Sequence, residues 1–254
     1  MAAALPSATF SGSRLVRRLS ELAGKPGTAT RDKAGGRVAQ QTFAERLGLW
    51  LDWTDAIALS AALNVTPAPK PAAPDANSDA AALHLHRAAV AACARVHRDL
   101  VKLATADVAF AADKAGAPRL SPAAAATAPD ASDFSPHRRD YLAHQRAMEN
   151  SLGPLRVNLR AALASHSAAL ARIAALDAVM DEALRVRERH LLATVPQWLE
   201  KHFAYLDQTQ AADEDRLSRY QQDMQSVLLA ELDMRWQPIE GMMEALRHAA
   251  TQQS

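Results

Sequence analysis

The residues best suited to bind a metal are one cysteine and two histidines between positions 86 and 97. Cys93 and His97 stand four residues apart, so on a helix both could contact one ion. His86 lies two turns before Cys93, about 10 Å along a helix axis and too far for the same ion. Because Cys93 is the only cysteine, no thiolate-rich zinc site or internal disulfide can form. We expect a structural thiol here, with no metal and no cofactor, and the missing disulfide favours the cytoplasm.

Sequence motifs of common catalytic sites are absent from the chain. It contains no phosphate-binding loop, no Gly-x-Gly-x-x-Gly, no Gly-x-Ser-x-Gly, no His-Glu-x-x-His and no Cys-x-x-Cys. The Glu-x-x-His pairs of metal sites in helical bundles are missing as well. His166 falls in a heptad core position, where it either fixes the register of helix pairing or reaches solvent with its ring. We therefore expect a protein that is not an enzyme and has no small-molecule substrate.

A first candidate interaction site combines acidic and aromatic residues before residue 56. Asp52 and Asp55 flank Trp50 and Trp53 on a predicted helix. Because tryptophan concentrates binding energy at interfaces, this strip could dock a partner. The alternative, which we favour, is an ordinary amphipathic helix that packs its tryptophans into the core.

A second candidate site is the basic face of a short N-terminal helix. Arg14, Arg17 and Arg18 lie opposite leucines there, and they could contact nucleic acid or an anionic membrane together with the basic residues between Arg138 and Arg189. The formal net charge of the whole chain is only +1, so any such binding would be local. A solvated helix face is the favoured interpretation, and the adaptor function is kept as an alternative.

Helix signals run along most of the sequence, whereas strand patterns are missing. Ser13 can cap a helix that ends before Gly24, and Thr42 can open a second one. The predicted organisation is amphipathic helices in 1–63, a Pro-rich linker in 64–79, a third helix in 80–113, an Ala/Pro-rich disordered linker in 114–134, and a helical hairpin in 135–254. The fold class is therefore all-α, with a long antiparallel, coiled-coil-like hairpin in the C-terminal half.

The strongest pattern is a seam of apolar residues at heptad spacing that starts at Tyr141. It continues through Met148 and Leu155 on one position and Leu152 and Leu159 on the other. Three further leucines broaden this seam beyond a contact between two helices: Leu163, Leu170 and Leu184. We expect a third helix or a second subunit to cover them, so a homo-oligomer or a helical protein partner is predicted.

Two observations place the tip of the hairpin near Pro196. Residues 137–195 carry nine arginines against six acids, whereas residues 197–254 carry five bases against ten acids. Antiparallel pairing would set these opposite charges side by side. Pro154 and Pro238 are equally far from Pro196, so two kinked helices would bend at one height. The same register predicts that Trp236 lies beside Arg156.

Three segments resemble a bacterial protein family of about this length whose function is unknown. They are Ser13–Leu22 with the sequence SRLVRRLSEL, Phe43–Leu63 with FAERLGLWLDWTDAIALSAAL, and Ser151–Arg160 with SLGPLRVNLR. The resemblance implies an all-helical protein and supplies no catalytic or binding residues. It also implies a partner associated with the cell envelope.

Overall fold

A computed structural model describes residues 13–22, 53–64, 76–114, 133–209 and 213–251 of the chain. Nearly all of these residues are helical and none of them lies in a strand, so the predicted all-α class is confirmed. The helices are α1 (Arg14–Leu22), α3 (Trp53–Asn64), α4 (Ala76–Lys114), α5 (Ser135–His166), α6 (Ala168–Leu192), α7 (Val195–Thr209) and α8 (Asp213–Thr251). None of these helices is long and apolar enough to cross a membrane.

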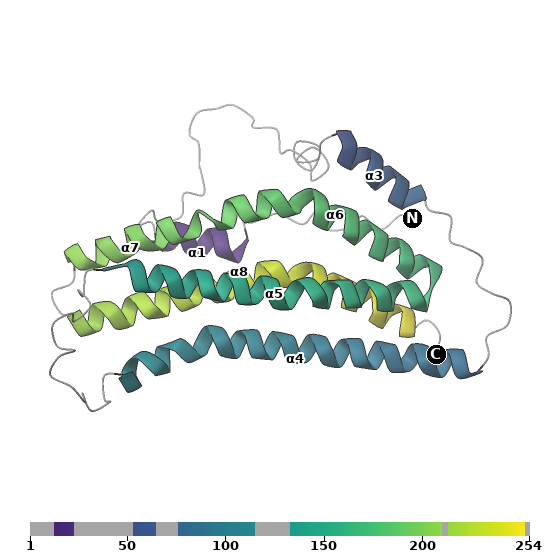
Figure 1. Ribbon diagram of the computed structural model, residues 1–254, viewed down its shortest axis with the longest axis horizontal. Helices are drawn as coiled ribbons and strands as arrows, with labels where there is room; N and C mark the ends of the chain where they lie inside the picture. Colours follow the sequence, from purple (N-terminus) through teal and green to yellow (C-terminus); the bar gives the residue numbers. More distant parts are fainter. Residues whose placement is uncertain (1–12, 23–52, 65–75, 115–132, 210–212, 252–254) are drawn as a thin grey trace, which may run out of the picture.

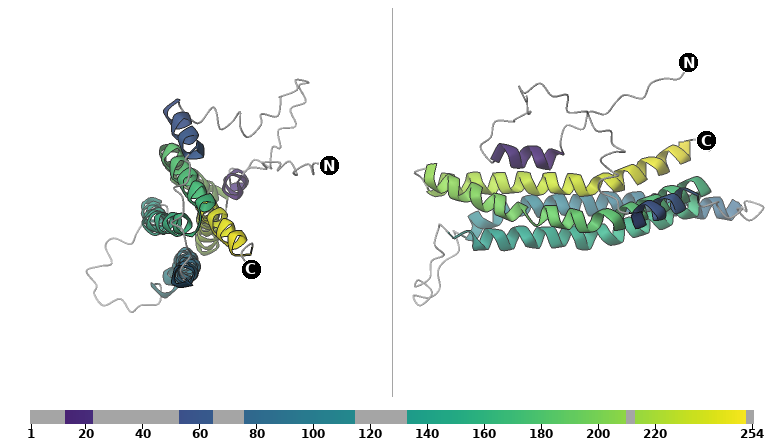
Figure 2. Two further views of the ribbon diagram at one scale, coloured as in Figure 1. Left: turned by 90° about the vertical axis from the view of Figure 1, so that its right-hand side faces the viewer. Right: turned by 90° about the horizontal axis from the view of Figure 1, so that it is seen from above.

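Four long segments lie side by side and form an elongated bundle. They are α4, α5, α6 together with α7, and α8, and each runs opposite to the one before it (Figure 1). α5 is central because it contacts α4, α6, α7 and α8. The short helices lie outside this bundle: α3 packs on α6, and α1 packs on α8 and α7 (Figure 2).

The predicted reversal of the chain near residue 196 is wrong. α6 and α7 continue in one direction, and the chain turns back instead at Ser167 and between α7 and α8 (Figure 1). Ser167 has extended backbone angles, φ −157° and ψ 159°, and its side-chain oxygen accepts a hydrogen bond from the Leu170 N–H at 3.2 Å. One residue therefore ends α5 and caps α6.

Pro196 interrupts the helix between α6 and α7 without turning the chain. A proline has no N–H, so the carbonyl of Leu192, four residues earlier, lacks its helical partner. The side-chain amide of Gln145 on α5 donates to this carbonyl at 3.3 Å. The Thr194 N–H bonds the Leu191 carbonyl at 3.2 Å, which gives one tight turn before α7 begins. The break is thus accommodated by a side chain from the neighbouring helix.

The other two prolines do lie at similar heights, but through parallel pairing. α5 and α8 run in the same direction, and Arg235 on α8 contacts Glu149 on α5 at 3.5 Å. Pro238 follows Arg235 by three residues and Pro154 follows Glu149 by five. Pro154 and Pro238 can therefore lie at the same height along the bundle without a hairpin at Pro196.

The predicted contact between Trp236 and Arg156 is also wrong. The Trp236 ring packs against His97 of α4, with ring centroids 4.7 Å apart and ring planes tilted by 59°. Arg156 instead donates to Asp177 and Asp181 on α6, because α6 folds back onto α5 at Ser167.

The predicted heptad seam is buried in α5 and is lost after Ser167. Tyr141, Met148 and Leu159 are at most 1% exposed and contact the core residues of α8. Beyond the turn, Ala169 is exposed and Ile173 is 39% exposed. The seam ends there because the reversal gives α6 a new set of neighbours.

Replacing Ser167 with alanine should lower the free energy of unfolding by about 1 kcal/mol, since alanine cannot accept the Leu170 N–H. Replacing it with glycine should cost only a few tenths of a kcal/mol. Urea unfolding of the two variants checks this order. The same alanine substitution at Ser165, whose hydroxyl donates to the Ala162 carbonyl within the helix, is the control and should have little effect. Equal losses at both serines would contradict the capping role.

Candidate interaction surfaces

Helix α3 carries the first candidate site and exposes most of its apolar side chains. Trp53 is 80% exposed, Ile57 54% and Leu63 60%, whereas only Ala62 is buried against the bundle. The expectation that Trp53 packs into the core is therefore wrong. Asp55 is partly buried, and Trp50 and Asp52 lie outside the described residues.

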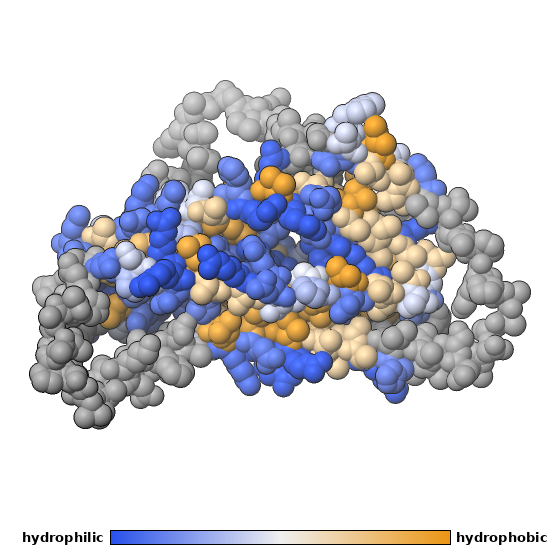
Figure 3. Space-filling view, in the orientation of Figure 1, coloured by the Kyte–Doolittle hydropathy of each residue, from blue (hydrophilic) through white to orange (hydrophobic). Residues whose placement is uncertain are grey.

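The surface around α3 is apolar over an extended area. Orange and tan side chains cover α3 and continue over the end of the bundle beneath it (Figure 3). Val157 on α5 and Ile173 on α6 are 57% and 39% exposed. Between Ala161 and Ala171 the sequence has no acidic residue, lysine or arginine. An exposed apolar surface of this kind is typical of an interaction site. We call the exposed apolar residues of α3, namely Trp53, Ile57 and Leu63, the α3 face.

Helix α1 carries the second candidate site, and its basic residues have protein partners. The Ser13 hydroxyl accepts the Val16 N–H at 3.3 Å, which confirms the predicted cap. Arg14 pairs with Asp233 of α8 at 2.5 Å, and Arg18 pairs with Glu21 at 2.9 Å. Arg17 is exposed. Two of the three arginines therefore take part in ion pairs within the chain.

The chain itself covers much of the predicted leucine stripe. Leu163 is 0% and Leu170 4% exposed, on either side of the turn at Ser167, and Leu184 is half-buried. We predicted that either a third helix or a second subunit would cover these leucines. In the described part of the chain, neighbouring helices of the same chain cover Leu163 and Leu170. Contact of these leucines with a partner stays a prediction.

A buried polar cluster, which sequence reasoning missed, connects α5, α6 and α8. Glu231 is 0% exposed and accepts hydrogen bonds from Tyr141 at 2.5 Å, Gln145 at 3.0 Å and Arg235 at 3.0 Å. Burial and the Glu231 charge raise the pKa of Tyr141 well above its ordinary value, so its hydroxyl stays a donor. Arg235 also reaches Glu188 on α6 at 3.4 Å. The signal available in the sequence was Glu231, an acidic residue within the otherwise apolar run 227–232.

A second missed cluster joins α5 to α6 and is here called the clasp, made of Arg156, Arg160, Asp177 and Asp181. Each arginine donates to both aspartates over distances of 2.6 to 2.9 Å. Burial alone would raise the pKa of Asp181, but the hydrogen bond from Arg160 and the nearby arginine charges outweigh it and lower the pKa. The signal in the sequence is four-residue spacing within each like-charged pair, which puts both members on one helix face.

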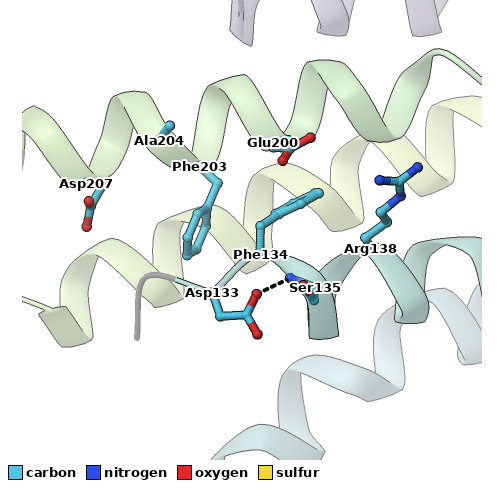
Figure 4. A pocket seen from close by; sticks show the side chains of 8 residues that line it. All are labelled: Asp133, Phe134, Ser135, Arg138, Glu200, Phe203, Ala204 and Asp207. Carbon is cyan, nitrogen blue, oxygen red and sulfur yellow. Dashed lines mark hydrogen bonds between the residues drawn. The ribbon is translucent and has the colours of Figure 1, made fainter. Parts of the chain in front are cut away.

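A shallow cavity of about 350 Å³ lies between the start of α5 and α7 (Figure 4). The Phe134 and Phe203 rings lie 5.9 Å apart between acidic residues at its rim. Hydrogen bonds from the Ser135 side chain and from the Ser135 N–H, the latter at 2.8 Å, lower the pKa of the Asp133 carboxyl. Both rings are at least nine-tenths buried, so the cavity offers little open aromatic surface.

The residues considered for metal binding lie in structural surroundings. The Cys93 thiol is fully buried in α4, and burial raises its pKa. His97 packs against the tilted Trp236 ring, as described above. His166 is half-buried at the end of α5, and its buried Nδ1 atom has no hydrogen-bond partner among the described residues. Among the described residues, no three His, Cys, Asp or Glu side chains are grouped so that they could hold a metal ion.

Comparison with known protein families gives a match that spans nearly the whole chain. Residues 1–248 match the family described as protein of unknown function (DUF3348). The chain belongs to the DUF3348 family. The resemblance to a family of unknown function seen in the sequence is thereby confirmed. The function of the DUF3348 family is itself unknown, so this match assigns none. No curated protein and no solved structure matches the chain significantly.

Proposed function

We propose that this protein is a non-enzymatic helical scaffold that associates with a second copy of itself through the α3 face. The carrying observation is the 80% exposure of Trp53 on a largely apolar helix that has no separate polar face. A helix with that composition is ordinarily buried all round, whereas among the described residues α3 packs chiefly on α6. A cover for the remaining sides is therefore expected.

The charge of α3 favours a second copy as that cover. Asp55 is the only charged residue of Trp53–Asn64. A two-fold axis sets a surface against itself, so a strongly charged face would repel its own copy, whereas a nearly neutral apolar one would not. A stable interface buries about 800 Å² per partner, and a helix about 18 Å long supplies only part of it. The second copy should therefore also cover the apolar surface of the bundle beside α3 (Figure 3).

The interior polar groups support a structural role rather than catalysis. Glu231 and the clasp aspartates hold helices together through hydrogen bonds to arginine, glutamine or tyrosine. The clasp arginines and two of the three α1 arginines pair with acids of the same chain, so the alternative as a nucleic-acid or membrane adaptor is not favoured. We also propose a cytoplasmic location, because the single cysteine is a buried free thiol.

Self-association predicts that Trp53→Glu or Ile57→Glu lowers the molar mass of the protein in solution to that of the 27.3 kDa monomer. Each substitution would bring two carboxylates together across the two-fold axis, where like charges are costly. Light scattering over a range of protein concentrations measures the mass. Val186→Glu is the matched control, because Val186 is 64% exposed on α6 but is not part of the α3 face. A monomeric wild type, or equal dissociation by the control, would contradict the proposal.

A further inference from the structure

Helix α1 is held on the bundle by one short apolar face and one exposed ion pair. Leu15 is 4% exposed, and Leu19 and Leu22 pack against the core from partly exposed positions. The Arg14 and Asp233 side chains of its ion pair are 62% and 42% exposed, so solvent screens their attraction. With nine residues, α1 is too short to be a stable helix by itself. Its helical state therefore depends on docking.

The surface of α7 and α8 under α1, here called the α1-binding surface, extends further along α7. Glu200 and Asp207 of α7 line the cavity at α5, and α1 lies on the side of the bundle away from α5 (Figure 2). Trp198 and Tyr205 precede Glu200 and Asp207 by two residues each. Residues two apart do not share a helix face, so the two rings lie on the side of α7 away from α5, which is also the side on which α1 lies. They remain 44% and 57% exposed. Apolar surface is thus left uncovered beside α1.

The direction of α1 brings its end towards these two rings. Arg14, its first residue, pairs with Asp233, whereas α7 pairs with the earlier part of α8 through His202 and Asp223 at 2.8 Å. Because α1 also contacts α7, it must run from Asp233 back towards Asp223. A helix that continued beyond the position of Leu22 would therefore approach Tyr205.

We propose that the α1-binding surface is a docking site for an amphipathic helix of a partner protein, and that α1 is its exchangeable occupant. The partner helix carries a basic residue opposite Asp233 and leucines one, five and eight positions later, as α1 does. It is longer than α1 and covers Trp198 and Tyr205. This added contact lets it compete with α1, which has the advantage of being tethered. The inference concerns a different surface from the α3 face and can fail or succeed separately.

The test uses full-length protein and fluorescent peptides. The short probe has the sequence of residues 13–22, and the long probe adds seven helical residues whose leucines continue the same stripe. Leu15→Asp should release α1, so that the short probe binds this variant about tenfold more tightly than wild type in fluorescence anisotropy. Val16→Asp is the matched control, because Val16 is 56% exposed on the outer side of α1, and it should bind like wild type. Arg14→Asp provides a second release variant that leaves the core untouched.

The long probe tests the extended surface. It should bind the Leu15→Asp variant about tenfold more tightly than the short probe, and Trp198→Ala with Tyr205→Ala should remove that gain. Asp233→Arg should weaken both probes. Equal binding of the short probe to wild type and to both release variants would overturn the proposal, as would a long-probe gain that survives loss of both rings. A molar mass that falls on Leu15→Asp would identify a second copy as the occupant and overturn it too, whereas failure of the α3 face alters the mass without altering peptide binding.

Discussion

Replacing Glu231 with leucine should lower the free energy of unfolding by about 3–5 kcal/mol, the cost of removing one partner from a buried ion pair. The substitution leaves the Arg235 guanidinium, whose side chain is 9% exposed, with only the more distant Glu149 and Glu188. It also removes the acceptor of the Tyr141 hydroxyl and one of the two acceptors of the Gln145 amide. Unsatisfied buried donors add to the loss. Urea unfolding followed by circular dichroism measures it.

Glu240→Leu is the control for this prediction, because Glu240 lies on the same helix and is exposed. Its effect should stay within about 0.5 kcal/mol, as for most surface substitutions. Glu231→Gln should fall between the two, since an amide oxygen still accepts from Tyr141 but no longer neutralises Arg235. Similar losses for Glu231→Leu and Glu240→Leu would show that the cluster contributes nothing specific.

Removing Asp177 should produce the second large loss. Asp177→Ala leaves two arginines side by side with Asp181 as their remaining partner in the clasp. The arginine side chains are 16–17% exposed, between the buried and the exposed cases, so we expect a loss of about 2 kcal/mol. Glu182→Ala is the control, because that side chain is 77% exposed beside Arg185, and it should be nearly neutral. The ratio of the two losses tests whether the clasp is more than a surface ion pair.

The clasp also predicts how stability changes with pH. The pKa of Asp181 is lower in the folded protein than in the unfolded chain. Its contribution is therefore complete above the unfolded value of about 3.9 and disappears as the pH falls through the lower folded value. The double variant Asp177→Asn with Asp181→Asn should lose less stability than wild type between about pH 5 and pH 2. Unfolding midpoints in urea across this range measure the difference, and parallel curves would contradict it.

The sequence predicted local structure better than chain direction. Ser13 caps α1 because its hydroxyl needs only a neighbouring N–H, and the seam of α5 is buried because residues seven apart share a helix face. Whether neighbouring helices are parallel or antiparallel changes neither signal. The equal spacing of Pro154 and Pro238 from Pro196 was therefore compatible with an antiparallel hairpin. The helices that carry them, α5 and α8, are parallel instead.

A candidate site could be predicted from the sequence only where all of its residues lie on one helix. Arg14 and Trp53 could be singled out because a face of one helix displays them. The partner of Arg14 could not, because Asp233 is 219 residues away and meets it only after the bundle forms. The acceptor for Gln145 was hidden for a similar reason, since Leu192 offers its carbonyl only because Pro196 lacks an N–H. Such pairings depend on topology, which heptad spacing does not specify.

The one-residue turn at Ser167 has a consequence for the order in which the helices meet during folding. Residues joined in the clasp are 17 to 25 positions apart, whereas Arg14 and Asp233 are separated by 219. Closing a longer loop costs more chain entropy, and contacts between near neighbours form sooner. We therefore expect α5 and α6 to pair early and α1 to reach an already assembled bundle. The helix that arrives last can then also leave without disturbing the others.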